Sequence, residues 1–243
     1  MKLSVFGSSS AGNGYALEFD NGKILLIEAG VPLKAFIEKY PDRWGDVLGC
    51  LITHEHKDHC KFAEQYIEFG INLYATSETL EAICVKGFYK TNVMPPQQIL
   101  VFDKHISVLP FKVVHNALNP VGFMIIDTKT DESLLFITDS AYLEYRFQDI
   151  DYMVVECNNI EEVANFNNLN GRMASSIYHM NLETTKRFLG HCDLKNTKKI
   201  ILIHLSDANS IETRMINEVQ EQTNISTSVA NVGDVYELRK DPF

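Results

Sequence analysis

Three histidines and two acidic residues lie together in the stretch Thr53-His54-Glu55-His56-Lys57-Asp58-His59, directly after an apolar run. Side chains alternate along an extended segment, so His54 and His56 project to the same side. We therefore expect His54 and His56 to bind one metal ion. Asp58 and His59 fall where the chain turns into a helix, displaced from the first pair, and are free to bind a second cation. The spacing predicts a site for two metal ions.

Three more residues of ligand type each follow an apolar, strand-like run. They are His115 after Phe111–Val114, Asp139 after Leu135–Thr138, and His204 after Ile200–Ile203. Any one of them alone would more often be an ordinary polar residue at a strand edge. Sheet-based sites gather catalytic groups from the ends of different strands. Together with the histidine-rich stretch, these three residues are predicted to complete the metal site.

Alternating and continuous apolar runs predict the elements that must position these residues. Predicted strands cover Leu3–Phe6, Tyr15–Phe19, Lys23–Ile27, Val47–Ile52, Asn72–Ala75, Leu100–Phe102, Ile106–Leu109, Phe111–Val114, Val121–Asp127, Leu134–Thr138, Tyr152–Val155, Lys199–His204 and Val235–Leu238. Asn21-Gly22 favours a type I′ hairpin turn between the second and third of them.

Predicted helices cover Pro32–Glu38, Cys60–Phe69, Glu78–Val85 behind a Ser77 N-cap, Leu182–Leu189 between an Asn181 cap and a stop at Gly190, and Ile211–Val219. Helices therefore flank the β segments on both sides. The layer arrangement that buries such strands is an α/β fold, a four-layer αββα sandwich.

With 243 residues, 45% of them hydrophobic, and no linker-like segment, the chain is expected to form a single domain over residues 1–243. The absence of a secretory signal and of a long apolar stretch predicts a cytoplasmic protein with no membrane contact. Five scattered cysteines suggest neither disulfides nor a zinc-thiolate site. A formal charge of −10 argues against the broad basic surface of duplex-binding proteins, and it favours small or end-bound substrates.

The ordered motifs, a His-x-His-x-Asp-His string followed by His, Asp and His, resemble those of the metallo-β-lactamase superfamily. The resemblance implies that one metal is held by His54, His56 and His115, the other by Asp58, His59 and His204, with Asp139 bridging both. It also implies that Asp58 and Asp139 act in catalysis and that a water shared by the cations is the nucleophile. Two such cations acidify a shared water and stabilise the oxyanions of a displacement. Zinc is the first expectation, and manganese is also consistent with these ligands.

His179, just before the predicted helix at Leu182, is a further catalytic candidate. Phosphodiesterase branches of the superfamily, such as ribonuclease Z, carry a histidine at such a helix start, and there it protonates the leaving oxygen. The alternative is a polar residue beside a helix cap. Arg172 could hold a phosphate, although it could equally be an exposed loop residue.

Within the superfamily, the chain most resembles YycJ-like (WalJ-like) hydrolases. The supporting strings are Gly7-Ser8-Ser9-Ser10-Ala11-Gly12-Asn13-Gly14, Leu25-Leu26-Ile27-Glu28-Ala29-Gly30, Pro120-Val121-Gly122-Phe123 and His204-Leu205-Ser206-Asp207-Ala208-Asn209-Ser210. Relatives usually carry Asp-x-Gly where this chain has Glu28-Ala29-Gly30, so the support of the site is expected to differ there.

The resemblance predicts a dinuclear metal-dependent hydrolase of phosphodiester bonds, most simply a nuclease acting on nucleic acid. A cyclic-nucleotide phosphodiesterase is an alternative that suits the acidic charge. A thioester or lactone hydrolase like glyoxalase II would use the same ligands without needing His179. A structural metal module would require closed coordination, which two adjacent metals sharing a water do not have. A homodimer is expected by analogy with relatives.

Overall fold

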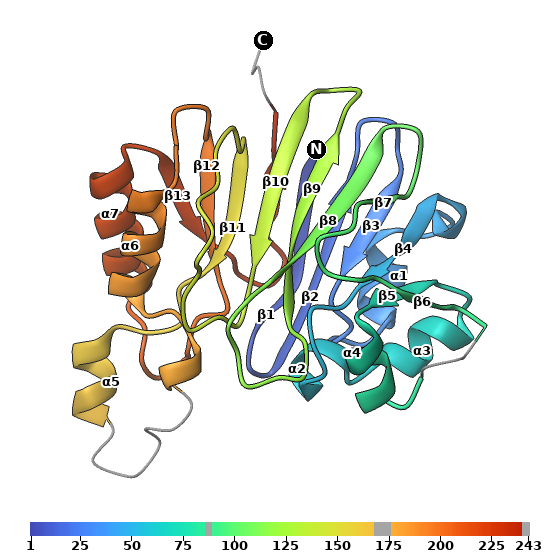
Figure 1. The fold of residues 1–243 in the computed structure, drawn as a ribbon, viewed down its shortest axis with the longest axis horizontal. Helices are drawn as coiled ribbons and strands as arrows, with labels where there is room; N and C mark the ends of the chain where they lie inside the picture. Colours follow the sequence, from blue (N-terminus) through green and yellow to red (C-terminus); the bar gives the residue numbers. More distant parts are fainter. Residues whose placement is uncertain (86–88, 168–175, 240–243) are drawn as a thin grey trace.

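The computed structural model describes residues 1–85, 89–167 and 176–239, and its strands form two seven-stranded sheets (Figure 1). The first sheet has, in order, β14 (Val235–Glu237), β1 (Lys2–Ser9), β2 (Gly12–Glu18), β3 (Ile24–Ile27), β4 (Val47–Leu51), β5 (Leu73–Ala75) and β6 (Thr91–Val93). The second has β13 (Ser226–Val229), β12 (Lys199–Ile203), β11 (Tyr152–Glu156), β10 (Glu132–Ile137), β9 (Val121–Asp127), β8 (Ile106–Lys112) and β7 (Leu100–Val101).

Helices cover the outer face of each sheet (Figure 1). The first sheet packs against α1 (Lys34–Lys39), α3 (Ala63–Glu68) and α4 (Ser77–Ala82). The second packs against α6 (Leu182–His191) and α7 (Glu212–Thr223). Two short helices, α2 (Lys57–Cys60) and α5 (Glu161–Asn167), lie at the loop end of the sheets. The predicted four-layer αββα sandwich is confirmed.

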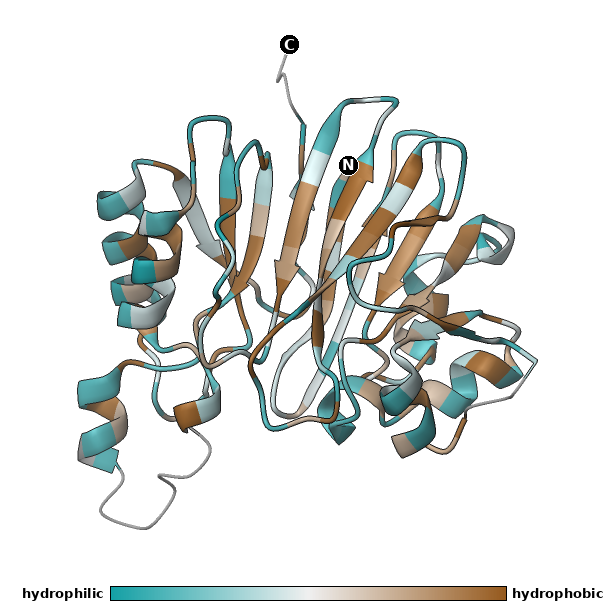
Figure 2. Ribbon diagram, viewed as in Figure 1, coloured by the Kyte–Doolittle hydropathy of each residue, from teal (hydrophilic) through white to brown (hydrophobic). Residues whose placement is uncertain are grey.

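Each sheet lies between a helix layer and the other sheet, so its central strands are buried on both faces. Such strands are apolar along their whole length. In β3, Leu25 and Ile27 enter the core between the sheets, whereas Ile24 and Leu26 face the helices. The same division holds in β12, and Figure 2 shows hydrophobic residues concentrated along the central strands. Between the sheets, the Tyr15 ring packs edge-on against Phe136, with ring centroids 5.2 Å apart.

The hairpin between β2 and β3 is confirmed, but its predicted turn type is wrong. A type I′ turn needs positive φ at both central residues, and of Asn21 and Gly22 only Gly22 has it, at 81°. The Gly22 amide donates to the Phe19 carbonyl, so the four-residue turn ends at Gly22. This is a type I turn followed by a glycine bulge, in which the Asn21 side chain accepts a hydrogen bond from the Lys23 amide.

Three helix predictions need correction. The predicted helix over Cys60–Phe69 is split into α2 and α3, because the His59 carbonyl and the Phe62 amide bind the backbone of Ala29 instead of continuing the helix. The N-cap of α4 is Thr76, whose hydroxyl accepts from the Thr79 amide, and not Ser77. Gly190 does not stop α6, which runs on to His191.

No helix of the described ranges is long and apolar enough to cross a membrane.

Candidate metal centre

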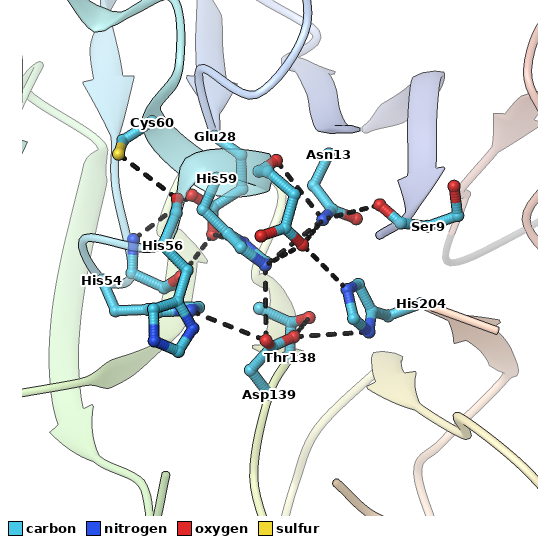
Figure 3. Close-up of polar contacts among 12 residues, drawn as sticks. Ser9, Asn13, Glu28, His54, His56, His59, Cys60, Thr138, Asp139 and His204 are labelled. Carbon is cyan, nitrogen blue, oxygen red and sulfur yellow. Dashed lines mark hydrogen bonds and ion pairs between the residues drawn. The ribbon is translucent and has the colours of Figure 1, made fainter. Parts of the chain in front are cut away.

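The segments that follow β4, β8, β10 and β12 bring the predicted ligands to one place. Figure 3 shows His54, His56, His59, Asp139 and His204 there. Strands β10, β11 and β12 are parallel, so residues that follow them meet at the same edge of the second sheet. The loop after β4 and helix α2 bring the histidine-rich stretch to that edge from the first sheet. The structure thereby brings together all seven residues expected to bind metal: His54, His56, Asp58, His59, His115, Asp139 and His204.

The seven residues form two groups that share one carboxylate. Ligand atoms of His54, His56, His115 and Asp139 lie within 4.8 Å of one another, and so do those of Asp58, His59, Asp139 and His204. This is the grouping that the motifs imply, with Asp139 common to both. Oδ2 of Asp139 lies 3.6 Å from His54 Nε2 and 3.4 Å from His115 Nε2. The same oxygen is 3.4 Å from His59 Nε2, so Asp139 stands between the groups.

The nitrogens of the first group point at a common centre. The Thr53 hydroxyl donates to Glu28, so His54 must use its Nδ1–H on that hydroxyl, 2.9 Å away. His54 Nε2 then carries a lone pair, and it is buried without a hydrogen-bond partner among the described residues. His115 similarly directs Nδ1 at the Tyr178 carbonyl, 2.9 Å away, and turns Nε2 to within 3.1 Å of His56 Nδ1. Converging imidazole lone pairs beside a carboxylate fit a divalent cation.

The second group contains two carboxylates, and all of its members except the partly exposed Asp58 are buried. Asp58 Oδ2 lies 3.1 Å from His59 Nε2 and 3.3 Å from His204 Nε2. Burial alone would lower the pKa of His204, but the Asp139 and Asp58 carboxylates raise it to about 10. The pKa of His59 is also raised, since Asp139 and Glu28 outweigh its burial. Burial favours the neutral form of Asp139, yet the imidazoliums of His204 and His59 hold its pKa well below the usual range. In the absence of a cation, protons on these histidines balance the carboxylates.

The Glu28 side chain supports residues of both ligand groups. Its side chain is fully buried, and Oε1 accepts a 2.6 Å hydrogen bond from Thr53, which in turn orients His54. The same oxygen lies 3.4 Å from His59 Nδ1, which turns Nε2 of that ring toward the carboxylates. Burial raises the pKa of Glu28 against the lowering effect of His59 and Thr53. Glu28 therefore contacts His59 of the second group directly and His54 of the first group through Thr53.

Backbone conformation at the site is unusual. Asp139 and His204 have φ of 47° and 56°, and Glu28 has φ of 67°, all in the left-handed region that non-glycine residues rarely occupy. Each such residue costs on the order of 1 kcal/mol or more and persists only where surrounding contacts impose it. The left-handed turns direct the two ligands from the ends of β10 and β12 toward the centre.

His179 lies beside the second group, as the sequence suggests, and its partner Glu156 was not foreseen. Nδ1 of His179 is 2.5 Å from Glu156 Oε1, and its ring stacks on His204 with an interplanar angle of 10°. Burial lowers and Glu156 raises the pKa of His179, with a net rise. Glu156 is fully buried at the end of β11 and also accepts from the backbone amides of Ser140 and Met180. Its position after the apolar run Tyr152–Val155 is the same strand-end signal that marked the ligands.

Other supporting contacts have weaker sequence signals. The Ser8 hydroxyl accepts from the His204 amide at 3.1 Å and from the Tyr15 hydroxyl at 3.0 Å. The Asn158 side chain donates to the His204 carbonyl, and the Asn13 side chain lies 3.2 Å from Asp58 Oδ2. A Cβ on Gly30 would lie 1.6 Å from the Asp58 carbonyl oxygen, so only glycine fits there.

The Cys60 thiol donates to the carbonyls of Glu55 and His56 and belongs to neither ligand group. Arg172 lies outside the described residues.

The chain is similar to known proteins in sequence and in fold. The Beta-lactamase superfamily domain matches residues 26–205. The chain is 29% identical over 247 residues to exodeoxyribonuclease WalJ of Streptococcus pneumoniae serotype 2, covering 90% of this chain and 88% of WalJ. It is 27% identical over 263 residues to exodeoxyribonuclease YycJ of Bacillus anthracis, covering 98% and 94% of the two chains. The crystal structure of Zn²⁺-bound PqqB from Methylobacterium extorquens superposes with a TM-score of 0.78 at 16% identity, covering 98% of this chain and 100% of PqqB.

Proposed function

The chain belongs to the β-lactamase superfamily, and from that premise we propose that it is a metal-dependent hydrolase that cleaves phosphodiester bonds in nucleic acid. The observation that carries the proposal is the His179–Glu156 pair beside the two ligand groups. A sugar oxygen leaving from phosphorus is a poor leaving group without a proton, whereas a thiolate, whose acid has a pKa of about 8.5, leaves unaided. A positioned acid therefore supports a phosphodiester over a thioester.

The residues present fit two divalent cations. His54, His56 and His115 would hold one, Asp58, His59 and His204 the other, and Asp139 would reach both. Bound cations would supply an activated water and Lewis acidity toward the phosphoryl oxygens. The imidazole nitrogens favour zinc, the metal bound in PqqB, and the carboxylates of the second group also suit manganese.

Side chains of the protein would act on the leaving oxygen. The Glu156 carboxylate accepts a hydrogen bond from His179 Nδ1–H, which fixes the orientation of the ring. Nε2 of His179 is left to carry the proton that the departing oxygen takes. The rise in the pKa of His179 keeps more of the ring protonated near neutral pH. Asp139 contacts His59, and Asp58 contacts His204. Through these histidines the two carboxylates position the reacting groups.

The relatives that match over most of their length are named exodeoxyribonucleases, and these names support DNA as the substrate.

We further propose that residues 1–243 act as one domain in the cytoplasm. The homodimer expected from the sequence is tested by light scattering of the purified chain.

Two variants test the proposal on the zinc- or manganese-loaded protein. Asp139→Ala should lose bound metal and activity together. His179→Ala should keep the metal content of the wild type yet cleave DNA about 10²- to 10⁴-fold more slowly, the usual contribution of a general acid. Substrates are 5′-labelled DNA and RNA, cyclic mononucleotides and S-lactoylglutathione. Cleavage of the thioester alone, or unchanged turnover by His179→Ala, would contradict the proposal.

A further inference from the structure

Five exposed apolar residues lie on the segments that carry residues of the metal centre. They are Val114 (37% exposed), Leu118 (66%), Tyr142 (49%), Ile177 (65%) and Tyr178 (37%), called here the apolar rim. Every one lies on a segment that also carries a site residue: the first two flank His115, Tyr142 follows Asp139, and the last two precede His179. None of the five side chains bears a charge at neutral pH. Large exposed apolar residues gathered around a reaction centre indicate contact with a substrate.

Backbone contacts hold the rim together and fix it to the centre. The His115 ring binds the Tyr178 carbonyl at 2.9 Å, and the two rings are 6.3 Å apart between centroids. The Ala141 amide donates to the Val114 carbonyl, and the Ser140 hydroxyl donates to the Tyr142 carbonyl at 2.7 Å. The Leu118 amide is bound by the Glu55 carboxylate at 2.9 Å. The two tyrosines therefore stand at positions set by the metal-binding segments.

The chemistry of the rim matches nucleobases and not phosphates. Aromatic rings stack on the face of any base, which gives affinity without sequence preference. A chain with a formal charge of −10 is poorly suited to binding a polyanion through a broad basic surface. A phosphate brought to the centre carries its two neighbouring nucleosides to the rim. Bases inside a duplex have both faces covered, so only an unpaired base can stack there.

Given the proposed function, we propose that Tyr142 and Tyr178 are stacking platforms for the unpaired bases next to the phosphate being cleaved. The substrate class is then an unpaired end or single strand of nucleic acid. Neither tyrosine hydroxyl makes a hydrogen bond within the described part of the chain, so the ring is the part of each side chain that acts.

The test compares variants on two oligonucleotides, using metal-loaded protein. Tyr142→Ala and Tyr178→Ala should each lower kcat/KM for a single-stranded oligodeoxynucleotide about tenfold, mainly through KM, with metal content unchanged. Tyr142→Phe and Tyr178→Phe keep the ring and should match the wild type. Tyr89→Ala removes a tyrosine that is 77% exposed on a segment carrying no site residue, and it should have no effect.

A second oligonucleotide, with abasic residues flanking the cleaved phosphate, separates stacking from damage to the fold. The alanine variants should equal the wild type on it, because no base remains to stack. Alanine variants that cleave the normal strand at the wild-type rate, or that lose as much on the abasic strand, overturn the inference while leaving the proposed function standing. A wild-type protein that cleaves no oligonucleotide contradicts the proposed function itself.

Discussion

Glu156 joins several parts of the site through a single buried carboxylate. One oxygen faces both His179 and His204, at 2.5 Å and 3.4 Å, and the other accepts two backbone amides. Burial would raise the pKa of Glu156, but His179 lowers it, so the group is charged at neutral pH. A charged partner keeps the proton on the adjacent ring.

Replacing Glu156 by glutamine removes that charge with little change in size. The pKa of His179 is raised by Glu156 and should fall in the variant, so the protonated ring is lost at lower pH. We expect the alkaline limb of the kcat–pH profile to move to lower pH. His179→Gln is the control, since its residual rate should lack that limb. An alkaline limb that stays in place in Glu156→Gln would contradict the assignment of the acid.

The turns after β10 and β12 show how the elements direct ligands. Asp139 and His204 take left-handed backbone conformations where their strands stop, and a helix or a continued strand would turn the same side chains away. This conformation suits glycine, so the chain accepts a local cost in order to place a ligand.

This cost can be measured at Asp139 in the metal-free protein. Asp139→Gly and Asp139→Ala both lose the carboxylate, but only glycine tolerates a φ of 47°. Asp139→Gly should therefore be more stable than Asp139→Ala by about 1 kcal/mol in urea denaturation with chelator present. At Asp58, inside α2, the order should reverse, because alanine is favoured over glycine in a helix by a similar amount. If the glycine and alanine variants had the same order of stability at both positions, the strain at Asp139 would be refuted.

Sequence patterns predicted the strands and the ligands for the same physical reason. A strand buried on both faces is continuously apolar, so its end is marked by the first polar residues, which are Thr138-Asp139 after β10 and His204 after β12. Glu156 follows the same rule and could have been found by it. Strand β13, with the sequence Ser226-Thr227-Ser228-Val229, is polar at an edge and carries no such signal.

Features set by contacts distant in sequence could not be predicted. The break between α2 and α3 depends on Ala29 binding the backbone of His59 and Phe62. The apolar rim combines residues 114, 118, 142, 177 and 178, whose segments only the folded chain brings together. Periodicity in the sequence describes a segment and its two faces, and it contains nothing about such partners.

At the scale of the molecule, the centre lies across the junction of the two sheets. His54, His56, Asp58 and His59 come from the first sheet's side, and His115, Asp139 and His204 follow strands of the second. Ligands that bind only the folded state raise its stability by mass action. Two cations held in this way would therefore tie the sheets together.

Removal of metal should lower the melting temperature, and the difference should grow with pH. In the metal-free fold the pKa of His204 is about 10, above its ordinary value of 6.5, so its ion pairs stabilise that fold fully below pH 6.5 and are lost as the pH rises through about 10. A cation must displace this proton, so its affinity should rise with pH and its binding should release protons.

Isothermal titration in buffers of different ionisation enthalpy measures the protons released on metal binding. Differential scanning calorimetry with and without chelator measures the shift in melting temperature. Metal binding at pH 7 without proton release would contradict the protonation of His204 in the metal-free fold.

The position of Tyr15 has a consequence for how the protein can vary. Its ring fills space between the sheets against Phe136, and its hydroxyl holds Ser8, which in turn holds the backbone of His204. The packing between the sheets and the position of His204 are therefore linked through one side chain. A change at Tyr15 should therefore disturb the metal centre as well as the core, and a compensating exchange at Phe136 would restore the packing between the sheets but not the hydroxyl contact with Ser8.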